Sequence, residues 1–179
     1  DDVEAWFQLA EVLFHYGPWR GESVRGAREP FERVIFYEPD HVTALWHLAR
    51  IASIENRLDD LDAIVAQVEA LAPEGDRMIE LTAMRAFRHG DPAGMVAAER
   101  ALGDAIDLTR WMSVWNIAAY GVDPDAAHRL AGPLVDGSRA REVRATGHLV
   151  RAHMELARGR PAAADRELDA VERLDPAAA

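Results

Sequence analysis

The chain has 179 residues, no cysteine and a formal charge of −11 at pH 7, which is enough length for one substantial domain or one array of small units. The negative charge argues against general binding of nucleic acid and against docking on anionic lipid, because both need a basic surface. Without cysteine the chain has no disulfides, thiolate metal ligands or cysteine nucleophiles, in keeping with a reducing cytoplasm.

The composition favours helices. Alanine, arginine, leucine, glutamate and aspartate are abundant, and valine, isoleucine and threonine never gather into alternating runs. No apolar stretch approaches the roughly 20 residues that cross a bilayer, so we expect a cytoplasmic protein without a membrane segment. The scarcity of lysine beside alanine, arginine, aspartate and glycine suggests a high-GC bacterial gene.

Apolar residues at helical spacing, and the breaks between them, predict ten helices. In chain order we expect them over 3–16, 25–37, 41–54, 58–71, 75–88, 92–104, 108–120, 125–135, 139–158 and 161–173. Asp2, Asp40 and Asp91 are the predicted N-caps. Pro92 and Pro161 fall in the first turns of their helices, where proline is tolerated.

The breaks between helices recur at a fixed distance. Pro39 and Pro73 lie 34 residues apart, and so do Asn56 and Gly90. A repeat of this length is typical of solenoids, in which each unit is one helix pair. No single pair can bury its apolar face alone, so we expect a core that continues through the stack.

The interior of each unit carries a recurring pattern of apolar and small residues. In the first unit these residues are Trp6, Leu9, Ala10, Ala27, Phe31 and Pro39. The pattern resembles the tetratricopeptide repeat (TPR) family, whose units read W-x2-L-G-x2-Y, then A-x3-F, then Ala and Pro. The second unit also matches, the third and fifth match more loosely, and the fourth matches least, because Gly132-Pro133 interrupts its second helix.

The resemblance implies an all-α, right-handed α-solenoid of about five antiparallel helix pairs. The units would cover about 3–40, 41–74, 75–108, 109–142 and 143–176, as one domain over 1–179. The chain opens without methionine, which leaves room for a leader or an upstream domain.

The segment 14–31 combines three glycines, Trp19 and a Gly-x-x-x-x-Gly spacing. A phosphate-binding loop would follow a strand and would continue into Lys-Ser or Lys-Thr. This segment follows a predicted helix and continues into Ala27-Arg28, so we interpret it as an insertion in a helix–helix turn. We expect Trp19 to fold back onto the edge of the array. A loop that contacts a partner is the alternative, because Trp19 and Arg20 are residue types that anchor interfaces.

Motifs for catalysis and metal binding are missing. The seven histidines fall one to a helix or turn, apart from His148 and His153, which are five residues apart. The acidic residues over 55–62 lack the glycine and the final glutamate of a calcium loop. No Gly-x-Ser-x-Gly motif or other nucleophile–base set is present. We therefore predict no enzyme activity, no metal and no cofactor for this chain.

The TPR resemblance implies a concave groove lined by the first helix of each pair. Carried over unit by unit, the candidate peptide-binding residues are Trp46, Arg50, Arg77, Glu80, Met84, Arg88, Trp115 and Asn116. Aromatic and methionine side chains supply contact area, and arginine can hold a carboxylate through two hydrogen bonds. For each aromatic residue, packing between neighbouring helices is the alternative to exposure in the groove.

The sequence therefore predicts a protein–protein interaction module or scaffold that binds a peptide or a partner helix without chemical change. One alternative is a regulatory or sensory arm of a larger bacterial signalling enzyme or transcription regulator. Another is a self-associating structural array whose terminal units stack end to end.

Overall fold

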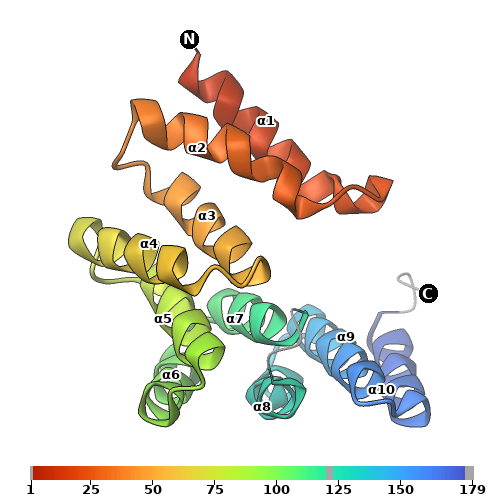
Figure 1. Ribbon diagram of the computed structural model, residues 1–179. Coiled ribbons are helices and arrows are strands. Elements are labelled where there is room, and N and C mark those ends of the chain that lie inside the picture. The colour runs from red at the N-terminus through yellow and green to blue at the C-terminus, as the bar shows by residue number, and fades with distance from the viewer. Residues whose placement is uncertain (1, 120–122, 176–179) are drawn as a thin grey trace. The chain divides into compact units, whose positions relative to one another are not determined.

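The structure is a computed structural model that describes residues 2–119 and 123–175, and within these residues every regular element is helical (Figure 1). The predicted all-α class is confirmed. The α-helices of the described residues are α1 Val3–Tyr16, α2 Arg28–Tyr37, α3 Val42–Ile54, α4 Leu58–Leu71, α5 Asp76–His89, α6 Pro92–Asp104, α7 Asp107–Ala119, α8 Pro124–Leu130, α9 Arg141–Ala157 and α10 Pro161–Leu174. Three short 3-10 helices accompany them: η1 Pro18–Arg20, η2 Val24–Ala27 and η3 Gly132–Val135.

None of the helices in the described residues combines the length and the apolar character that a transmembrane span requires.

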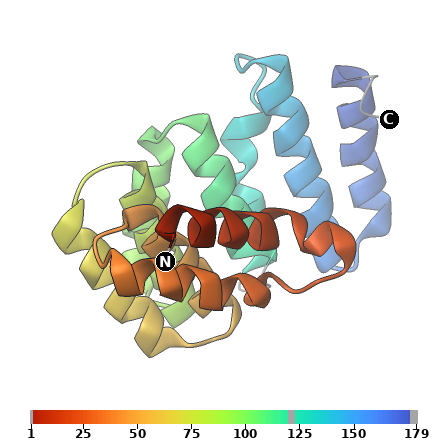
Figure 2. The same ribbon diagram turned by 90° about the horizontal axis from the view of Figure 1, so that it is seen from above.

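The helices form two compact units, one up to Leu81 and one from Thr82 onward, with the boundary inside α5. In the first unit α1 packs on α2, α2 on α3 and α3 on α4, and in the second unit each helix from α6 to α10 packs on the next. Figure 2 shows α1 beside α2 in the first unit, and α9 beside α10 in the second.

The core of the first unit lies between α1, α2 and α3. Phe14 from α1, Phe31 from α2 and Ile51 from α3 are all almost completely buried in one apolar cluster. Ala10 and Ala44 in the same cluster are fully buried, and their small side chains let the helices approach closely. The apolar period read from the sequence thus corresponds to a packed core in this unit.

In the second unit, α9 packs against both α10 and η3. Gly147 of α9 lies so close to η3 that a Cβ atom there would be 2.7 Å from Cβ of Leu134. Arg110 of α7 is buried and donates hydrogen bonds to the carbonyl oxygens of Leu102 (2.9 Å) and Gly103 (2.6 Å). These carbonyls belong to the last turn of α6, where a positive charge stabilises a helix end.

Two of the three predicted N-caps are confirmed. The Asp2 side chain accepts a hydrogen bond from the Ala5 N–H, and Asp91 accepts one from the Ala93 N–H. The prediction for Asp40 is wrong, because α3 begins one residue later than expected. There the Nδ1 atom of His41 accepts from the backbone N–H of residue 44 at 3.2 Å.

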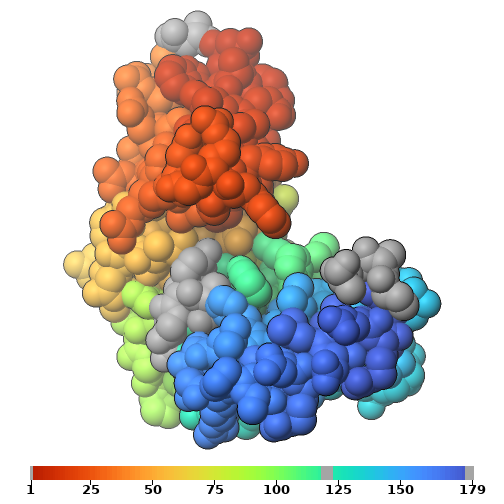
Figure 3. All heavy atoms as spheres, turned by 90° about the vertical axis from the view of Figure 1, so that its right-hand side faces the viewer, coloured from red at the N-terminus to blue at the C-terminus, as the bar shows by residue number. Residues whose placement is uncertain are grey.

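The segment between α1 and α2 forms η1 and η2, and its atoms face the viewer in Figure 3. The expectation that Trp19 folds back is wrong, because Trp19 is 88% exposed. The chain leaves α1 at Gly17, where a Cβ atom would lie 2.4 Å from the carbonyl oxygen of Leu13. It then turns at Gly21, whose φ of +77° favours glycine. Pro18 opens the η1 turn between these two glycines.

The helix predicted over 125–135 is two elements in the structure. α8 ends at Leu130, and η3 continues from Gly132 to Val135. Proline has no N–H to donate, so Pro133 cannot extend the α-helical ladder. The helix predicted over 25–37 likewise starts with the 3-10 turn η2 before α2 begins at Arg28. The predicted end of α7 at residue 120 lies outside the described residues.

Candidate functional site

Four of the eight predicted groove residues meet in the first unit, around the ring of Trp46. The guanidinium carbon of Arg50 lies 4.9 Å from the centre of this ring and 4.7 Å from that of Phe14. Arg77 places its guanidinium 5.6 Å from the same Trp46 ring. The carboxylate of Glu80 comes within 4.0 Å of Arg50 Nε, which is an ion pair but too long for a hydrogen bond. The cluster therefore holds two arginines on one aromatic ring.

The two arginines differ in exposure. Arg50 is only 5% exposed, and its Nε and Nη1 atoms have no hydrogen-bond partner. Arg77 is exposed and has no ion-pair partner among the described residues. Stacking on an aromatic ring leaves the N–H edge of a guanidinium available for hydrogen bonds. Arg77 is thus the residue of this cluster that a ligand from solvent can reach.

The other four predicted groove residues lie in the second unit. Met84 and Asn116 are buried, whereas Arg88 and Trp115 are half-buried. The Trp115 ring lies 5.1 Å from the ring of His153. Since the eight residues are divided between two units, one groove that runs through all of them stays a prediction.

Half of the predicted groove residues are buried: Arg50, Glu80, Met84 and Asn116. The first helix of a pair packs against neighbours on more than one side, so a position read as groove-facing can lie inside the core. Burial leaves these side chains little surface for a ligand, and their role in peptide binding stays a prediction.

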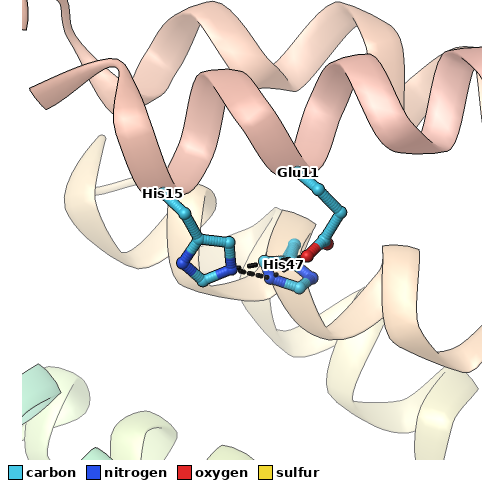
Figure 4. A group of neighbouring side chains, drawn as sticks. All are labelled: Glu11, His15 and His47. Atoms are coloured by element: carbon cyan, nitrogen blue, oxygen red, sulfur yellow. Dashed lines mark hydrogen bonds and ion pairs between the residues drawn. The ribbon is translucent and has the colours of Figure 1, made fainter.

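A second cluster lies at the contact between α1 and α3, where Glu11, His15 and His47 point toward one another (Figure 4). The Nε2 atoms of the two histidines are 3.4 Å apart. Oε2 of Glu11 is 3.5 Å from Nε2 of His15, and Oε1 is 3.4 Å from Nε2 of His47. Nδ1 of His47 lies 2.9 Å from the carbonyl oxygen of Thr43, which can only accept a hydrogen bond.

The surroundings keep His47 neutral. Desolvation by burial lowers its pKa to about 3, and the nearby positive charge of Arg50 acts in the same direction. Its ring stacks on Phe31 with ring centres 4.7 Å apart and an angle of 15°. Burial also lowers the pKa of His15, although Glu11 opposes the shift. A neutral His47 that donates from Nδ1 presents an Nε2 lone pair to the other two side chains.

Sequence reasoning missed this cluster. The sequence assigns His47 only to a helix, but its side chain is buried in the first unit, where it is 1% exposed. His15 and His47 are 32 residues apart and meet only because α1 packs near α3. The usable signal was the spacing of Glu11 and His15, which places them one turn apart on the same helix face.

Two more histidines join an ionic network in the second unit. His148 contacts Glu167 at 2.6 Å, and His128 contacts Glu155 at 3.2 Å. Arg151 reaches Glu167 at 3.2 Å. Within the described residues, His128 and His148 do not meet in a group of three metal-ligating side chains. These contacts therefore link α8, α9 and α10.

Comparison of the chain with models of protein families, with curated proteins and with solved structures finds no match. The likeness to TPR units therefore rests on the residue pattern of the sequence alone.

Proposed function

We propose that the chain is a protein-interaction module in which TPR-like helix pairs stack as a right-handed solenoid and bind a peptide or a partner helix without chemical change. The 34-residue period between Pro39 and Pro73 supports this arrangement. Further support comes from the packing of consecutive helices from α1 to α4 and from α6 to α10.

The observation that carries the proposal is the shared Trp46 ring. In a chain with a formal charge of −11, two arginines converge on this ring. Neither Arg50 nor Arg77 has a carboxylate within hydrogen-bonding distance among the described residues. A guanidinium over the face of an aromatic ring keeps paired N–H donors that suit a carboxylate. The favoured ligand is therefore a peptide that places an acidic side chain or its C-terminal carboxylate against Arg77.

The test is a peptide-display selection against the 179-residue chain and an Arg77→Glu variant. Arg77 is exposed, so its charge can be reversed without disturbing the core. Arg50 is unsuitable because it is 5% exposed and its reversal would bury an unpaired negative charge. Arg33→Glu is the matched control, since Arg33 is also exposed and lies 5.9 Å from the Trp6 ring.

We expect enrichment of an acidic motif that Arg77→Glu loses and Arg33→Glu keeps, with equal circular dichroism for all three proteins. Selection of no motif, or a motif that the two variants lose equally, would contradict the proposal.

A specific observation favours a second candidate function, self-association through α1. Leu9, Val12 and Tyr16 recur at helical spacing on α1 and are 44%, 47% and 64% exposed. α3 is the first helix of the next repeat unit, and there Leu48 and Ile51 occupy the repeat positions that Leu9 and Val12 occupy in α1. Leu48 and Ile51 are only 7% and 0% exposed. An apolar face that is covered in one helix pair and open in the preceding one suits the packing of a further pair.

Sedimentation velocity over a range of protein concentrations tests this candidate. If α1 stacks on another copy, the average mass increases with concentration, and a Leu9→Glu, Val12→Glu variant remains monomeric. A mass that stays constant with concentration in the wild type would rule self-association out.

A further inference from the structure

We propose that Glu11, His15 and His47 bind a divalent transition-metal ion, for which Zn²⁺ is the reference. The proposal is independent of peptide binding and concerns the contact between α1 and α3 (Figure 4).

The spacing of the donor atoms carries the proposal. Nitrogen and oxygen ligands of a tetrahedral zinc ion, about 2.0–2.2 Å from the metal, lie about 3.3–3.6 Å from one another. The two Nε2 atoms are 3.4 Å apart, and the Glu11 carboxylate places Oε1 3.4 Å from His47 Nε2 and Oε2 3.5 Å from His15 Nε2. With one ligand atom from each residue, the three donors lie within 4.8 Å of one another.

The protonation states also suit a cation. His47 donates from Nδ1 to the Thr43 carbonyl, so its Nε2 atom faces the cluster with a lone pair. Glu11 Oε1 is a buried carboxylate oxygen without a hydrogen-bond donor. A proton on Nε2 of His15 can be donated either to His47 Nε2 or to Glu11 Oε2, and it leaves Glu11 Oε1 without a donor. A divalent ion accepts electron pairs from all three side chains together.

Neighbouring groups position the ligands before any ion binds. Glu11 and His15 lie one turn apart on α1, and the Thr43 carbonyl fixes the ring orientation of His47. Such a backbone hydrogen bond to the second ring nitrogen is the usual support of a metal-binding histidine. Stacking on Phe31 prevents the His47 ring from rotating away.

The cluster is reached from one side only. The His47 side chain is 2% exposed, whereas those of Glu11 and His15 are 28% and 43% exposed. Three protein ligands and an open fourth position are the arrangement in which a metal keeps a water or takes a ligand from solution. The positive charge of Arg50 opposes the binding of a cation at this cluster. The Glu80 carboxylate lies 4.0 Å from Arg50 Nε.

Imidazole and carboxylate ligands without a thiolate select for zinc and its neighbours among the transition metals. Mg²⁺ prefers oxygen ligands and keeps its water shell, so we expect it not to compete for this site.

The experiment is isothermal titration of the chelator-treated, 179-residue chain with Zn²⁺ at neutral pH, repeated in excess Mg²⁺. His15→Ala and Glu11→Gln remove one ligand each from the exposed side of the cluster, where folding is least affected. His153→Ala is the matched control, because it removes an exposed histidine that belongs to no cluster of three ligands in the described residues. Circular dichroism checks that all variants fold.

We expect one Zn²⁺ per chain, unaffected by Mg²⁺, with an affinity that falls at least about tenfold in His15→Ala and in Glu11→Gln. His153→Ala should bind like the wild type. Co²⁺ in place of Zn²⁺ should give the intense visible absorption of a tetrahedral complex, and His15→Ala should lose it.

Absence of a saturable one-to-one site in the wild type would overturn the proposal. An unchanged affinity in His15→Ala, or an equal loss in His153→Ala, would do the same.

Discussion

Replacement of Gly147 by alanine should destabilise the second unit although alanine is the better helix former. Gly147 is buried in α9, where the exchange alone would stabilise the helix by about 1 kcal/mol. The new methyl group would lie 2.7 Å from Leu134 Cβ and 3.1 Å from the Leu134 carbonyl carbon. One of these atoms is in the backbone and the other is bonded to it, so neither can rotate aside and η3 itself must shift.

Overpacking of a core by one methyl group costs about 1–3 kcal/mol. Together with the gain in helix propensity, the expected net loss for Gly147→Ala is on the order of 1 kcal/mol, which lowers the melting temperature of a chain this size by about 2–4 °C. Gly103→Ala is the matched control, because a Cβ atom at this position in α6 meets nothing within 4 Å. We expect it to stabilise the chain by about 0.4–1 kcal/mol.

The assay is thermal unfolding followed by circular dichroism, with urea unfolding as a second measure of the free energy. The two alanine variants should shift the melting temperature in opposite directions. If Gly147→Ala is as stable as Gly103→Ala, the close approach of α9 and η3 is wrong.

Three further changes test other parts of the structure. Arg110→Met removes the hydrogen bonds to the carbonyl groups of Leu102 and Gly103, and urea unfolding should show a loss of about 1.5–3 kcal/mol; no loss would mean that Arg110 does not cap α6. Burial alone would raise the pKa of Glu55, but hydrogen bonds from two arginines lower it below the usual value. The ionised Glu55 therefore stabilises the fold above the ordinary glutamate pKa of about 4.3, and this stabilisation is lost as the pH falls through the lowered pKa. The difference in unfolding free energy between the wild type and Glu55→Gln should accordingly shrink in acid and not stay constant. Asp123→Ala removes the N-cap of α8, and thermal unfolding should show a loss of about 1 kcal/mol rather than none.

The sequence predicted most helices because their signals are local. α1, α4 and α6 have the predicted bounds at both ends. Apolar spacing marks all three helices, and the N-caps Asp2 and Asp91 mark the starts of α1 and α6. Pro133 was recognised as an interruption, but the change from α8 to a separate 3-10 turn was not predicted. Pro133 accounts for the interruption locally, whereas the contact of η3 with α9 joins residues distant in sequence and has no local signal.

The candidate sites were harder to predict because they depend on which helix faces meet. Arg50 was expected in an open groove and is instead buried between two aromatic rings. Glu11, His15 and His47 come from two helices, and no motif of fixed spacing connects them. Trp19 was expected to pack on the array but is 88% exposed, in a short 3-10 turn between two glycines.

The most direct test of the proposed function follows the Trp46 side chain while a ligand binds. The indole N–H resonance of Trp46 can be assigned in a nitrogen-15 NMR spectrum by comparison with a Trp46→Phe variant. We predict that an acidic peptide from the display selection shifts this resonance, and that the same peptide with its carboxylate converted to an amide does not. A peptide that binds without moving the Trp46 resonance, or that binds equally well as the amide, would contradict the proposal that Trp46 and Arg77 form the ligand site.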